Sequence, residues 1–126
     1  MSSTELTLDQ LDISFTIRDW LELGKLNNSK KYAEFDQTTL EMIVEEGIRF
    51  AIEVVSPTRA ESDRNGCRLE DGRVKVSECL HKPYQKAYEL GWASTSNSQD
   101  YGGMGAPATI GLIVSEAING ANLGLG

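Results

Sequence analysis

The sequence predicts an all-α domain of about four helices that carries one small β-hairpin. Apolar residues recur every three or four positions in four separate segments, which is the spacing of one face of a helix. Clusters rich in glycine, asparagine and serine separate these segments, and such clusters are typical of turns. The 126 residues, 40% of them hydrophobic, are enough for one domain with its own core.

The first two helices are expected between residue 13 and Pro57, after a polar start, residues 1–10, that we expect to be disordered. Asp36 or Thr38 can cap the second helix, because either side chain can accept a hydrogen bond from the first turn. Pro57 cannot donate a ladder hydrogen bond, so it either ends this helix or kinks it. The first apolar face comprises Ile13, Ile17, Trp20, Leu21 and Gly24. The second comprises Leu40, Ile43, Val44, Gly47, Ile48, Ala51, Val54 and Val55.

A hairpin is expected around Asp71-Gly72, the favoured pair for a type I′ turn. Because an isolated hairpin is marginal in water, we expect it to lie against the helices. A third helix is predicted from about Lys82 to Leu90, and a fourth from near Pro107 to Gly120. Residues 25–35 are predicted as a loop. The inward face of the third helix is expected to comprise Leu80, Tyr84, Ala87, Tyr88, Gly91 and Trp92, with Trp20 and Trp92 as core anchors.

Composition excludes several classes of function. Nineteen acidic against twelve basic residues give a net charge of -7, which argues against nucleic acid and anionic membranes as partners. The longest apolar run, residues 110–114, is far too short to span a membrane. Residues 1–5 are polar and acidic, unlike a secretory signal peptide, so we expect a cytoplasmic chain. Cys67 and Cys79 are then expected to be reduced, buried apolar groups.

No free-standing catalytic motif is present, and each weaker candidate has a simpler interpretation. The glycine-rich residues 102–105 are expected to form a turn rather than a phosphate cradle, because no strand precedes them and Asp100 lies beside them. Glu41, Glu45 and Glu46 are expected to form a solvated helix face rather than a metal site. His81 is the only histidine and has no candidate nucleophile near it, so we predict no catalytic and no metal-binding residue.

The last fifth of the chain is unusual in its charge. Residues 102–126 carry one charged side chain, Glu116, and seven of the twelve glycines. A surface helix normally carries more charge, so either this segment is a central core helix or its apolar edge is covered. The cover can be the rest of a longer polypeptide, a ligand or a second subunit.

Two segments resemble the acyl-CoA dehydrogenase family. One is Glu89-Leu90-Gly91-Trp92, followed by a loop, by residues 100–105 and by a helix carrying Ser115-Glu116. The other, residues 66–74, is similar to a segment of the branch that includes 3-methylmercaptopropionyl-CoA dehydrogenases. The resemblance covers residues 13–126. The chain departs from the pattern where Ser115-Glu116-Ala117 replaces a frequent pair of acidic residues and where residues 93–99 are unusually polar.

This resemblance implies that residues 1–126 form the up-and-down helical N-terminal domain of an enzyme that oxidises acyl-CoA to 2,3-enoyl-CoA. In the family, FAD is held mainly by a middle domain and a C-terminal domain, which supplies the catalytic carboxylate. Both are absent here, so we expect the fragment to bind no FAD and to be inactive. Acyl-CoA, an electron-transfer acceptor and a homo-oligomeric assembly are the implied partners of the full enzyme. The implied contribution of this domain is one wall of the acyl pocket, formed by Asn122, Leu123 and Leu125.

Two other functions remain open at this point. The chain can be a non-catalytic helical module that uses its apolar C-terminal edge as a protein interface. It can also be a bundle that binds a small molecule, which requires an internal pocket.

Overall fold

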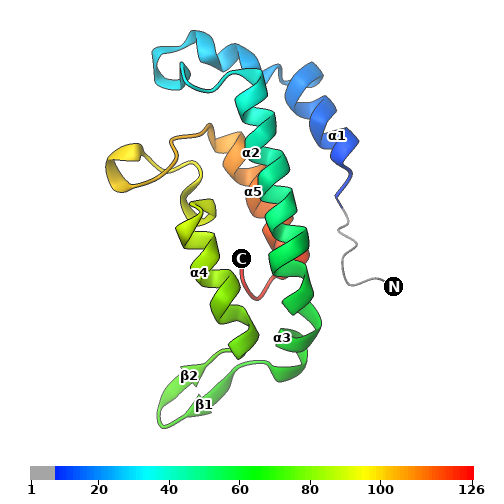
Figure 1. Cartoon of the computed structure of the whole chain (residues 1–126), viewed down its shortest axis with the longest axis vertical. Coiled ribbons are helices and arrows are strands. Elements are labelled where there is room, and N and C mark those ends of the chain that lie inside the picture. Colours follow the sequence, from blue (N-terminus) through cyan, green and yellow to red (C-terminus); the bar gives the residue numbers. More distant parts are fainter. Residues whose placement is uncertain (1–7) are drawn as a thin grey trace.

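The computed structural model, which describes residues 8–126, is mostly helical and has one two-stranded antiparallel sheet, as predicted (Figure 1). The longest helices, α2 (Gln37–Phe50) and α5 (Ala108–Ala121), pack along each other. Helix α4 (His81–Glu89) flanks this pair. The short helices α1 (Gln10–Phe15) and α3 (Arg59–Asn65) lie near its two ends. Strands β1 (Arg68–Glu70) and β2 (Arg73–Lys75) connect α3 to the segment before α4.

Helix α2 begins at the predicted cap. The Asp36 carboxylate accepts a hydrogen bond of 2.8 Å from the backbone N–H of Thr39, and this bond lowers the pKa of Asp36. Glu41 does not fold back on the cap. It accepts a bond of 2.7 Å from Gln37 and two bonds of 2.9 Å from Arg18. The bond from Gln37, together with those from Arg18, lowers the pKa of Glu41. Glu41 thereby ties α2 to the turn after α1.

These two carboxylates predict how stability depends on pH. Because the folded state lowers both pKa values, each carboxylate contributes stability above its ordinary pKa, and this is lost as pH falls through the folded value. We therefore expect the urea midpoint to fall on acidification below about pH 4.5. In the double variant Asp36→Asn and Glu41→Gln the acid dependence should be weaker. If the urea midpoint of that variant fell on acidification as much as that of the wild type, the effect would belong to other carboxylates.

The chain stays helical past the end of α2. A wide π-helical turn, Ala51–Val55, is followed by a 3₁₀ turn, Ser56–Thr58, that contains Pro57. Helix α3 then begins at Arg59. Pro57 therefore does not stop the helical path, because it falls in the first turn of a new segment where its missing N–H is not needed.

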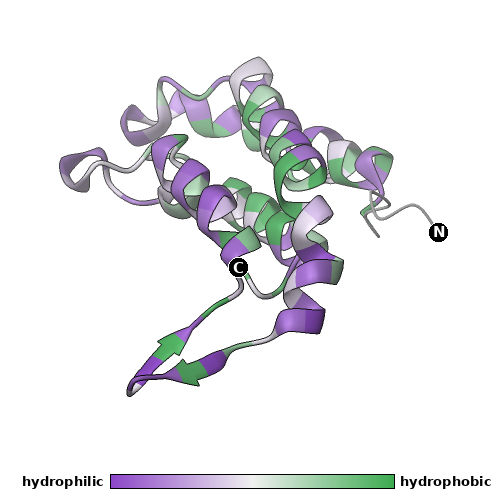
Figure 2. Cartoon of the chain, turned by 60° about the horizontal axis from the view of Figure 1, so that its bottom comes forward, coloured by the Kyte–Doolittle hydropathy of each residue, from purple (hydrophilic) through white to green (hydrophobic). Residues whose placement is uncertain are grey.

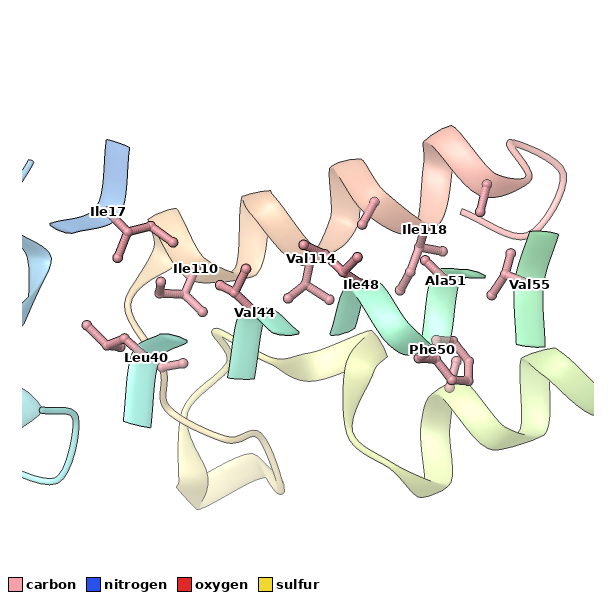
Figure 3. Packing of buried hydrophobic residues seen from close by; sticks show 14 of the residues in the cluster. Ile17, Leu40, Val44, Ile48, Phe50, Ala51, Val55, Ile110, Val114 and Ile118 are labelled. Carbon is pink, nitrogen blue, oxygen red and sulfur yellow. The ribbon is translucent and has the colours of Figure 1, made fainter. Parts of the chain in front are cut away.

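The core lies between α2 and α5 (Figure 3). Leu40, Val44 and Ile48 of α2 face Ile110 and Val114 of α5, and all five side chains are buried. Gly47 lets the two helices approach closely, because a Cβ at that position would lie 2.8 Å from Val114 Cγ2. The predicted stripe of the second helix is confirmed as the core face, although Ile43 and Val54 are only partly buried.

The first predicted helix is wrong in its length and in one anchor. Helix α1 ends at Phe15, a π-helical turn covers Thr16–Trp20, and Glu22 is left-handed with φ 48°. Ile17 is buried, as expected, but Trp20 is 71% exposed and Leu21, also predicted on this face, is 44% exposed. A π turn holds more residues than an α turn, so Trp20 does not return to the inward face that Ile17 occupies.

The connection to α2 also differs from the predicted loop over residues 25–35. The segments Leu23–Asn28 and Lys30–Tyr32 form 3₁₀ helices. Of the start that we expected to be disordered, residues 1–7 lie outside the described part. Asp9 caps α1 by accepting a hydrogen bond from the Leu11 N–H at 2.9 Å.

Three further expectations about burial are wrong. Tyr84 and Tyr88 pack on each other at the solvent side of α4, with ring centroids 4.8 Å apart, while Ala87 faces the core. Cys67 is exposed and only Cys79 is partly buried. The hairpin has the predicted turn, with positive φ at Asp71 and Gly72, but all six strand residues are exposed. It projects from the helices rather than lying against them (Figure 2).

Candidate functional site

The candidate pocket-wall residues lie where the chain leaves α5. Asn122 is extended, with φ -160°, and is only 6% exposed. Its Nδ2 donates hydrogen bonds of 2.9 Å to Thr58 Oγ1 and Ser62 Oγ, and its Oδ1 accepts one of 3.0 Å from the Gly124 N–H. Asn122 therefore joins the end of α5 to α3 and fixes the direction of the last residues.

A chain of polar contacts extends this network. Thr58 Oγ1 donates to the Val55 carbonyl at 2.7 Å, and the Thr58 carbonyl accepts from Cys79 Sγ at 3.7 Å. The Cys79 and Ser77 side chains are 3.2 Å apart, and Asn65 Nδ2 donates to Ser77 Oγ at 3.1 Å. Because these groups satisfy one another, the network serves first to position α3, the start of α4 and the end of α5.

Removing the Asn122 amide should destabilise the domain. We expect Asn122→Ala to lower the free energy of unfolding by about 2 kcal/mol, because Thr58, Ser62 and the Gly124 N–H each lose a bond beside the core. Urea denaturation measures this. The control is Asn119→Ala, which removes bonds made only to Ser115 within α5. An equal effect of the two substitutions would contradict the role of the network.

The two leucines after Asn122 differ in exposure. Leu123 is 77% exposed, whereas Leu125 is partly buried and packs against the core. Leu123 is thus the apolar side chain of the predicted wall that is mostly open to a ligand or another domain. Contact of these residues with an acyl chain stays a prediction.

A shallow groove between α2 and the end of α4 is a second feature, and the sequence did not indicate it. Its volume is about 450 Å³. Phe50 and Trp92 line it, with ring centroids 6.3 Å apart, and so do Arg49 and Glu46, which form an ion pair of 2.7 Å. The remaining lining residues are Met42, Ile43, Glu53, Val54 and Leu90. Phe50 is missing from the predicted stripe, although its spacing of seven from Ile43 is helical and could have revealed it.

Residues 102–105 form a turn, as predicted. Gly102 and Gly105 are left-handed, with φ 79° and 73°. Gly103 packs so closely on the Asn97 backbone that a Cβ would overlap it.

The carboxylates and the histidine considered above lie on helices α2 and α4. In the part of the chain that is described, no group of three or more His, Cys, Asp or Glu side chains could hold a metal ion. Glu41 and Glu46 are engaged by arginines, and His81 is exposed at the first position of α4. Within residues 8–126 no helix is long and apolar enough to cross a membrane.

Comparison with known proteins gives an informative match. No family model matches the chain. The chain is 31% identical over 115 residues to 3-methylmercaptopropionyl-CoA dehydrogenase of Ruegeria pomeroyi. The match confirms the resemblance to acyl-CoA dehydrogenases. It covers 91% of this chain but 20% of the relative, so the chain spans about a fifth of the length of the dehydrogenase it matches.

Proposed function

We propose that the chain is the N-terminal helical domain of a FAD-dependent acyl-CoA dehydrogenase that oxidises acyl-CoA to 2,3-enoyl-CoA in the cytoplasm. The observation that carries the proposal is similarity to a dehydrogenase along nearly the whole chain but along only a fifth of that enzyme. The structure adds a helical domain whose last helix ends in a fixed turn with an exposed leucine.

The flavin is best assigned to parts of the enzyme beyond this domain. In the described residues the glycine-rich segment is a turn with Asp100 beside it, which does not suit the diphosphate of FAD. This segment therefore does not fit a flavin site. The proposed share of this domain is to present Leu123 and Leu125 to the acyl chain, with Asn122 positioning both.

Two measurements on the purified 126-residue protein test whether FAD binding and catalysis require the other domains. We expect no flavin absorbance after expression and no reduction of an electron acceptor with acyl-CoA. A yellow or active protein would overturn the assignment of FAD to other domains. Reading the gene past the codon for Gly126 tests the fragment proposal, which requires an open frame that encodes those domains.

The pocket wall is tested in the enzyme that carries this domain. We expect Leu123→Asp to raise the KM for acyl-CoA about tenfold, because a carboxylate would lie against the apolar chain. Leu112→Asp is the matched control, since Leu112 is 69% exposed on α5 but outside the wall. Equal effects of the two substitutions would remove Leu123 from the pocket.

A non-catalytic interface module is the alternative function. The exposure of both Leu112 and Leu123 beside the buried face of α5 favours it. A symmetric dimer buried through residues 107–126 would support this module over the dehydrogenase domain.

A further inference from the structure

The β-hairpin is amphipathic, and both of its faces are open to solvent. Strand register places Leu69 opposite Val74, and these side chains are 75% and 68% exposed. Side chains alternate along a strand, so the charged residues of both strands lie on the opposite face. These are Arg68 and Lys75, which form one cross-strand pair, and Glu70 and Arg73, which form the other.

Such a hairpin is not stable as an isolated element. Two strands are marginal in water, whereas three or more with an apolar face are stable. The hairpin projects from the helices (Figure 2), so a further strand added to it would come from another molecule or another domain. Both outer edges of this two-stranded sheet are open to added strands.

The backbone of β1 offers the groups that an added strand needs. In a two-residue hairpin the pair next to the turn, Glu70 and Arg73, exchanges the hydrogen bonds. The next pair, Leu69 and Val74, therefore directs its N–H and C=O groups outward. Two copies of β1 that pair antiparallel about Leu69 would exchange two backbone hydrogen bonds there.

Charge distinguishes the two edges. Antiparallel pairing about Leu69 places Arg68 of each copy opposite Glu70 of the other, which is attractive in both places. Antiparallel pairing of two copies of β2 about Val74 would place Arg73 of each copy opposite Lys75 of the other, which is repulsive. The self-complementary edge is therefore β1, and its natural complement is the same strand of a second copy.

We propose that β1 pairs antiparallel with β1 of a second copy about a two-fold axis at Leu69. The product is a four-stranded sheet in the order β2-β1-β1-β2. Its apolar face joins Leu69 and Val74 of both copies, and the contact is small enough to give a weak, reversible dimer. This inference goes beyond the proposed function and does not depend on it.

Sedimentation of the 126-residue protein over a range of concentrations, up to roughly 1 mM, tests the dimer. Arg68→Glu should raise the dissociation constant at least about tenfold, because the introduced carboxylate would face Glu70 of the other copy in two symmetric places. Within the hairpin that carboxylate faces Lys75 of β2, although the substitution also removes the 3.6 Å ion pair between Arg68 and Glu70 of β1. The matched control is Lys75→Glu, which makes the same change in charge on the other strand and should leave dimerisation intact.

A mixing experiment makes the geometry specific. The double variant Glu70→Arg with Arg73→Glu keeps the charge pair inside the hairpin but should also be monomeric, because Arg68 would face an arginine. Mixed with the Arg68→Glu variant, it should form a heterodimer. Position 68 of each variant then faces position 70 of the other, and each of these two pairs joins a carboxylate to an arginine. A wild-type protein that stays monomeric, a dimer that survives Arg68→Glu, or a mixture that stays monomeric would each overturn the proposal.

Cross-linking supplies a distance test. Facing Cα atoms of a hydrogen-bonded antiparallel pair are about 5.5 Å apart, which a disulfide can span. In a chain with Cys67→Ser and Cys79→Ser, Leu69→Cys should form a disulfide-linked dimer under mild oxidation, and Val74→Cys should form much less. Equal cross-linking at the two positions would contradict pairing through β1.

Discussion

Ile110→Ala is expected to lower the free energy of unfolding by about 3 kcal/mol. Ile110 is 0% exposed and faces Leu40 and Val44 where α5 crosses α2 (Figure 3). The substitution removes buried methyl groups and leaves a cavity. The two packed helices cannot approach each other to fill it without disturbing the side chains around them. Urea denaturation followed by far-UV circular dichroism gives the value.

Leu112→Ala is the control for this cavity. Leu112 lies on the same helix two residues away but is 69% exposed, so its loss should change stability by less than about 0.5 kcal/mol. A similar cost for the two substitutions would show that helix propensity, and not burial between α2 and α5, sets the stability of this region.

Gly47→Leu is expected to destabilise the domain by about 3 kcal/mol. The Cβ alone would lie 2.8 Å and 3.0 Å from the two methyl groups of Val114, so the helices must separate to admit a longer side chain. Loss of the close contact also opens the core around it. The change should appear as a lower urea midpoint and a lower melting temperature.

Gly120→Leu is the matched control for this contact. Gly120 is also a helical glycine, but among the described residues no atom outside its own helical turn lies within 4 Å of a Cβ built there. Replacing it should stabilise the protein by about 0.5–1 kcal/mol, because leucine has the higher helix propensity. If Gly47→Leu were stabilising as well, the close approach of α2 and α5 would be wrong.

Local rules account for the parts of the fold that could be predicted. The stripe from Leu40 to Val55 repeats at helical spacing, so its buried face followed from the sequence. Asp36 was recognisable as a cap, and Asp71-Gly72 as a turn that needs positive φ at both residues. Each of these features depends on residues that are close along the chain.

The errors arose where two periodicities compete. Trp20 has α-helical spacing from Ile17, but a π turn intervenes and the indole reaches solvent. Tyr84 and Tyr88 have helical spacing from Leu80, but Pro83 and Ala87 are the buried residues of α4 and both tyrosines are exposed. Spacing alone does not tell which side of a short helix is covered.

The candidate site was predictable only as a place in the chain. The family resemblance drew attention to residues 122–125, and the sequence showed that the segment before them is almost free of charge. It did not show that Asn122 is held by Thr58 and Ser62, which are about sixty residues away in sequence. Nor did it indicate the groove at Phe50 and Trp92, which forms only when α2 meets the turn after α4.

By itself, the sequence determined the helical class, the core stripe of α2, the turn of the hairpin and the resemblance to acyl-CoA dehydrogenases. These follow from spacing, capping and turn residues, which act over a few positions. Only the tertiary structure decided that the hairpin stands away from the helices, that Leu123 is exposed and that Gly47 meets Val114. Those outcomes depend on which surfaces meet, because burial is shared between segments that are distant in sequence.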